Sequence, residues 1–163
     1  MEILKLSEII GQEIVELKFH YLPENEYGLQ SFHSYIKLKN ETIIGIPNFD
    51  DNEYLNLDQE NLNYYKTMFE TGQPLNHETS RQLIIGQKIT DFYFCYYENE
   101  IDFDFSAFIK LSNNYYLSEH NFGPIGITDV DLILFDEKRF NNEIERLKNI
   151  NVDVRSFSKT NHI

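Results

Sequence analysis

Acidic side chains at alternating positions are the feature of this sequence that bears most directly on chemistry. One residue separates each acid from the next, in the order Glu98, Glu100, Asp102 and Asp104. On one face of a strand, such carboxylates could bind a divalent cation or the Lys and Arg side chains of a partner. They could also mark a solvated strand edge, where charge prevents pairing with other sheets. Metal binding is the least favoured of the three, because the glycine and terminal glutamate of a calcium loop are absent.

A second acidic segment and one tyrosine complete the predicted partner-binding residues. Asp50, Asp51 and Glu53 lie in a polar stretch that follows the third predicted strand, and Tyr97 directly precedes the alternating acids. Tyrosines beside acids are typical of surfaces that contact Arg-rich proteins. The alternative for the tyrosines is cross-strand aromatic pairing, and the alternative for the acids is hydrated surface.

Motifs for catalysis or for cofactor binding are missing. The sequence has no glycine-rich phosphate loop, nucleophile elbow or metalloprotease motif. None of its histidines has a second His or a Cys at zinc-binding spacing, although His20 and His33 are predicted to approach each other on neighbouring strands. The one cysteine, Cys95, has no adjacent basic residue that would lower its pKa. We therefore expect a protein that is not an enzyme and that binds no cofactor or metal.

Net charge restricts the class of partner. The chain has 163 residues and a net charge of −13, from 27 acidic and 14 basic side chains. Residues 1–135 hold 22 of the acids and 8 of the bases. Such a surface repels nucleic acid and anionic membrane and attracts a cationic partner. No secretory signal or membrane-spanning apolar run is present, so the sequence predicts a cytoplasmic protein.

Two parts of the sequence resemble each other, which predicts an internal duplication. Residues 11–21 return as residues 86–96, with five identities in eleven positions at an offset of 75. Residues 34–40 parallel residues 107–113 at an offset of 73. A two-residue deletion in a connecting loop would account for the change in offset.

Hydrophobic periodicity assigns elements to each copy. Alternation with a period of two predicts three strands per copy, each set followed by a helix with i, i+4 apolar spacing. The predicted strands are residues 12–22, 31–39 and 42–47, then 86–97, 103–112 and 115–119, and the helices are residues 58–70 and the segment after Asp136. The alternation places Thr90 on the inner face of its strand and Asp91 and Cys95 on the outer face.

The predicted fold class is α+β, mostly antiparallel β, with two tandem copies of a β-β-β-α unit sharing one core. One domain is expected to span residues 1–163, because half-size units would be marginal alone. The first unit spans about residues 3–72, the second about 79–150, and residues 151–163 form a short C-terminal tail with an edge strand.

This arrangement resembles the immunity proteins of bacterial polymorphic toxin systems. The likeness rests on the strand openings at Gly11 and Gly86, the strand segments 36–38 and 109–111 before Asn turns, and the segment 124–127. The resemblance implies a protein that blocks a cognate toxin. In that reading, the acids bind a basic, nuclease-type toxin as a substrate mimic. The alternative is an enzyme, metal-dependent or small-ligand-binding, with its site between the copies.

Overall fold

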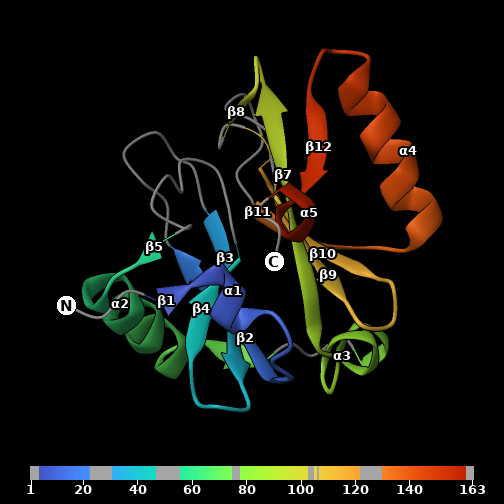
Figure 1. Ribbon diagram of the computed structural model, residues 1–163. Coiled ribbons are helices and arrows are strands. Elements are labelled where there is room, and N and C mark those ends of the chain that lie inside the picture. Colours follow the sequence, from blue (N-terminus) through green and yellow to red (C-terminus); the bar gives the residue numbers. More distant parts are fainter. Residues whose placement is uncertain are drawn as a thin grey trace.

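The computed structural model describes residues 4–22, 31–46, 56–74, 78–102, 105, 107–121 and 130–160. Within these ranges the chain has an α+β fold, and every strand pairing that they contain is antiparallel. The predicted α+β class with mostly antiparallel sheets is therefore confirmed. Figure 1 shows two larger sheets in the middle of the molecule, with helices α2 and α4 on opposite outer sides.

The first half of the chain builds the sheet next to α2. Its strand order is β4-β3-β2-β6, so that β2, β3 and β4 form the predicted meander. A separate pair, β1 and β5, lies beside it. The elements of this half are β1 (Leu4–Lys5), α1 (Leu6–Ile9), β2 (Ile14–Leu22), β3 (Ser31–Leu38), β4 (Ile43–Gly45), β5 (Asn56–Leu57), α2 (Gln59–Glu70) and β6 (Gln73–Pro74).

The second half builds the sheet next to α4. Its strand order is β11-β10-β9-β7-β12, with β8 paired to β7. The edge strand β12 lies in the C-terminal tail, where an edge strand was predicted, and β11 is an additional strand of this sheet. The elements are α3 (Glu78–Ile84), β7 (Ile89–Tyr97), β8 (Glu100–Ile101), β9 (Phe108–Leu111), β10 (Tyr116–Asn121), β11 (Val130–Phe135), α4 (Glu137–Lys148), β12 (Asp153–Ser156) and α5 (Phe157–Thr160).

The two meanders share their register. Leu17 pairs with Ile36 in the first, and Phe92 pairs with Ile109 in the second, at the same offsets of 75 and 73 as the sequence match. Each first strand has an irregularity at its start, between Ile14 and Glu16 and at the equivalent place in β7. These features support the predicted repeat. The duplication itself stays a prediction, because a shared pairing pattern does not establish shared ancestry.

Turns and caps follow the predicted chemistry in both halves. The Asn40 side chain accepts from the Thr42 N–H at 3.1 Å, and Asn113 accepts from Tyr115 at 3.2 Å. These asparagines close the turns before β4 and β10. At the helix starts, Asp58 and Asp136 cap α2 and α4 by accepting from backbone N–H groups three residues later, at 2.9 and 2.8 Å.

Reciprocal backbone hydrogen bonds join the two halves. We call the segments 11–14 and 86–89 the junction. The N–H of Gly11 donates to the Ile89 carbonyl at 2.7 Å, and the N–H of Gly86 donates to the Ile14 carbonyl at 2.8 Å. Both glycines have a positive φ, +96° and +89°, which side chains rarely allow. The N–H of Ile14 donates to the Gln87 carbonyl at 2.8 Å, and that of Ile89 donates to the Gln12 carbonyl at 2.9 Å.

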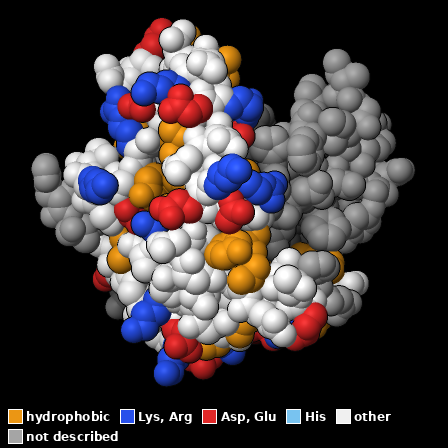
Figure 2. Space-filling view, turned by 90° about the vertical axis from the view of Figure 1, so that its right-hand side faces the viewer, with side chains coloured by type: hydrophobic (Ala, Val, Ile, Leu, Met, Phe, Trp, Pro, Cys, Tyr) orange, Lys and Arg blue, Asp and Glu red, His pale blue; other side chains and the backbone are white. Residues whose placement is uncertain are grey.

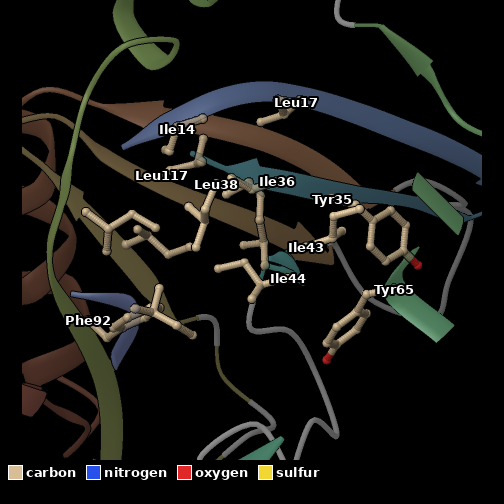
Figure 3. Close-up of a cluster of buried hydrophobic side chains, with 14 of the residues drawn as sticks. Ile14, Leu17, Tyr35, Ile36, Leu38, Ile43, Ile44, Tyr65, Phe92 and Leu117 are labelled. Carbon is tan, nitrogen blue, oxygen red and sulfur yellow. The ribbon is translucent and has the colours of Figure 1, made fainter. Parts of the chain in front are cut away.

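One continuous cluster of buried side chains contains residues from both halves. Figure 3 shows Ile14, Ile36 and Leu38 of the first half together with Phe92 and Leu117 of the second. A second cluster, under α4, includes Phe140 and Cys95. The outer face of β7, which carries Cys95, is therefore covered.

One predicted side-chain position is wrong at the start of β7. Thr90, expected on the inner face, is exposed, because the register irregularity between Ile89 and Asp91 inserts one residue there. Asp91 lies on the same face as Tyr93, as predicted. It is buried, with 8% of its surface accessible, because Ser156 and Ser158 cover its carboxylate.

Candidate partner-binding site

The first predicted acids lie on a tight hairpin between β7 and β8. Tyr97 pairs with Glu100, which leaves Glu98 and Asn99 as a two-residue turn. Both turn residues have a positive φ, 52° and 66°. Two successive left-handed residues are characteristic of the hairpin turn whose twist matches that of its strands. We call Tyr97–Glu100 the hairpin tip.

The predicted acidic residues differ in how exposed their side chains are. Glu98 and Glu100 are exposed at the hairpin tip, and 44% of the surface of Tyr97 is accessible. Asp102 is half-buried, and its N–H donates to the Cys95 carbonyl at 2.9 Å. The expectation that these acids share one strand face is wrong, because Glu98 lies in the turn itself. Asp104 lies outside the described residues.

A basic residue that sequence reasoning missed holds the hairpin tip. The Arg155 guanidinium, on β12, donates to the Asn99 side-chain oxygen at 3.1 Å and to the Asp153 carboxylate at 2.7 Å. It also lies 4.5 Å from the centre of the Tyr96 ring, which is a favourable cation–π distance. The only available signal was the position of Arg155 in a predicted edge strand. Arg155 therefore links the tip to β12 through Asn99, while its charge is paired with Asp153.

The remaining predicted residues are not brought into this site. Asp50, Asp51 and Glu53 lie outside the described residues, so their relation to the hairpin tip stays a prediction. His20 and His33 are backbone partners across β2 and β3, as expected for neighbouring strands. Among the residues that the structure describes, no group of three His, Cys, Asp or Glu side chains could hold a metal ion.

Cys95 is a core residue in this structure. Its side chain is 2% exposed within the cluster under α4. Burial, together with the nearby carboxylates of Glu143 and Asp102, raises its pKa to about 12. A thiol with such a pKa is a poor nucleophile at neutral pH.

A buried carboxylate holds the C-terminal helix. Asp91 accepts from the hydroxyl of Ser156, and from the N–H and hydroxyl of Ser158 at 3.1 and 2.9 Å. It also accepts from the Phe92 N–H at 2.8 Å. These bonds satisfy the carboxylate and tie α5 to β7. We interpret the group as structural, since a buried acid needs such partners.

Not every face of the molecule is acidic. Figure 2 shows the face over α4, where Lys and Arg side chains lie among Asp and Glu. The exposed positions of α4 include Lys138 and Arg139 beside Glu137. On this face the two signs of charge are therefore mixed.

No protein-family model, curated protein or solved structure matches this chain. The resemblance to immunity proteins therefore rests on the sequence features alone. Within the part of the chain that the structure describes, no helix is long and apolar enough to cross a membrane.

Proposed function

We propose that this protein is a non-enzymatic inhibitor, an immunity protein that binds a cognate bacterial toxin in the cytoplasm. The toxin has a basic surface and is of the nuclease type, and the protein occupies its cleft as an acidic mimic of the substrate. The observation that supports this proposal is the hairpin tip, where Glu98, Glu100 and Tyr97 are exposed together.

The tip is suited to binding because its geometry is already fixed. Backbone pairing across β7 and β8 and the Arg155–Asn99 hydrogen bond hold it before a partner arrives. A preorganised surface loses little conformational entropy on binding. Carboxylates that meet Arg side chains in a cleft form short, charge-assisted hydrogen bonds. Tyr97 adds a rigid aromatic contact of the kind enriched at binding hot spots.

The experiment first asks whether a neighbouring gene encodes a toxin-like domain, and then measures the binding of that domain as a function of ionic strength. The double variant Glu98→Lys/Glu100→Lys should weaken binding by about 2–5 kcal/mol if the acids are central, and reduce the salt dependence. Glu145→Lys, an exposed reversal on α4, is the control that should bind as wild type.

Binding that is indifferent to salt and to the double variant would contradict the acidic mimic. A calorimetric titration with divalent cations tests the alternative. Heat of binding and a raised melting temperature would favour a metal-dependent or small-ligand-binding enzyme instead.

A further inference from the structure

The junction has an unusual property for a contact within one chain, because its two strands are almost the same sequence. Residues 11–14 read Gly-Gln-Glu-Ile and residues 86–89 read Gly-Gln-Lys-Ile. Each hydrogen bond from the first segment has a counterpart from the second. Such a reciprocal contact is the arrangement of a symmetric dimer interface, in which one patch binds a copy of itself.

The backbone of the junction therefore does not determine its partner. The same four hydrogen bonds would form between residues 11–14 of two molecules, or between residues 86–89 of two molecules. Either pairing would join two chains through their corresponding halves. The remaining half of each chain could then pair with a further chain in the same way. Selection of the correct pairing requires a residue that differs between the segments.

The one difference lies at the position where the segments oppose each other. Glu13 and Lys88 are antiparallel bridge partners. Because the flanking residues, Ile14 and Ile89, carry the hydrogen bonds, this pair is of the non-hydrogen-bonded type. In that type the opposing Cα atoms are only about 4.5 Å apart and side chains are closest. Glu13 and Lys88 are therefore cross-strand neighbours, so that charges at these two positions can favour or disfavour the pairing.

We propose that the junction is a self-complementary interface and that Glu13 and Lys88 determine which partner it accepts. The correct contact between unlike halves places opposite charges together. A contact between like halves of two chains would place Glu13 against Glu13 or Lys88 against Lys88. Opposed like charges destabilise a strand pair, so the charge pair directs each half to the other and keeps the chain monomeric.

The test compares four full-length proteins: wild type, Glu13→Lys, Lys88→Glu and the double variant. Each single variant should raise the unfolding equilibrium constant by up to about fivefold, and the double variant should restore the wild-type value. The double variant keeps the wild-type net charge of −13. If repulsion within the net negative charge controlled stability instead, Glu13→Lys would stabilise the protein, because that change reduces the net negative charge. Glu145→Lys, with the same change in net charge, is the control and should not destabilise.

Light scattering after refolding at high concentration tests partner choice separately. In each single variant, positions 13 and 88 carry the same charge, so charge no longer distinguishes a contact between unlike halves from a contact between like halves. We therefore expect a larger dimer fraction than in wild type or the double variant. A coupling free energy between positions 13 and 88 that is zero within error would overturn the proposal. A non-zero coupling free energy with equal dimer fractions in all four proteins would also overturn it, since the charge pair would then only stabilise the fold. Neither readout depends on a toxin.

Discussion

Glu98 occupies a backbone conformation that its side chain does not favour. Its φ of 52° lies in the left-handed region, where Asn and Gly are preferred at the first position of this turn. Glu41 has a φ of 74° in a different turn, between β3 and β4, and the matching turn of the second half, between β9 and β10, has Asn114 with a φ of 66°. A glutamate at such a position is retained at a conformational cost, which fits a role for its carboxylate outside the fold.

Replacing Glu98 by Asn should therefore separate stability from binding. Glu98→Asn is expected to stabilise the protein by about 0.5–1 kcal/mol while weakening the proposed toxin binding. Urea unfolding measures the first effect and calorimetry with the toxin domain measures the second. Glu41→Asn is the matched control, which should stabilise without changing binding. Equal effects of the two variants on binding would show that the hairpin tip has no special role.

Glu16 supplies a pH-dependent contribution at the residue scale. Its carboxylate accepts from the Arg81 guanidinium at 2.8 Å and from the Leu17 N–H at 3.0 Å. Partial burial alone would raise its pKa, but these hydrogen bonds and the charge of Arg81 outweigh burial and hold the pKa below its ordinary value. A lowered pKa stabilises the fold above the unfolded-state pKa of about 4.3, and the contribution is lost as pH falls below it.

Arg81→Met should remove this dependence. At pH 7 we expect a loss of about 0.2–1 kcal/mol, because the pair is only partly buried. The difference between wild type and variant should shrink as the pH is lowered from 5 to 3. Urea unfolding at a series of pH values measures it. A difference that stays constant across this range would mean that Arg81 stabilises by packing and not by its charge.

At the scale of elements, α4 packs on its sheet through its buried side chains, Phe140 and Leu147. Phe140 is 2% exposed and stacks on the Tyr116 ring, with ring centres 3.7 Å apart. Its ring also lies edge-on to Phe108 at 5.1 Å and to Tyr93 at 5.2 Å. Tyr116 is desolvated there, which raises its pKa to about 12. The helix therefore depends on Phe140 more than on any of its exposed residues.

Phe140→Ala should destabilise the protein by about 3–5 kcal/mol, because it leaves a cavity among three rings. Asn141→Ala, on the exposed side of the same helix, should change stability by less than about 0.5 kcal/mol. Chemical denaturation compares the two. Near-UV circular dichroism of the tyrosines should change in the first variant only. A small loss for Phe140→Ala would mean that α4 is anchored elsewhere.

The elements were predictable where the signal was local. Alternation gave the strands, and Asp58 and Asp136 marked the helix starts at which they act as caps. The bulge near Asp91 was missed because the insertion of one residue leaves no mark in composition, and Thr90 is consequently exposed instead of buried. The role of Arg155 was missed because its partner, Asn99, is 56 residues away in the sequence.

At the scale of the molecule, composition gave the sign of the charge but not its distribution. The face over α4 carries both signs, whereas the hairpin tip at the end of β7 presents Glu98 and Glu100. The sequence also predicted that the copies share a core, and the buried cluster does contain side chains of both halves. The hydrophobic pattern of the sequence did not reveal the junction, because periodicity within a strand does not specify the strand with which it pairs.

The position of the junction has a consequence for the order in which the chain folds. Within each meander, neighbouring strands are close in sequence, so their ends meet after a short search. Gly11 and Ile89, in contrast, are far apart along the chain and must find each other after both meanders exist. Contacts of this kind are late and slow. We therefore expect each half to collapse first and the docking of the halves to limit the rate.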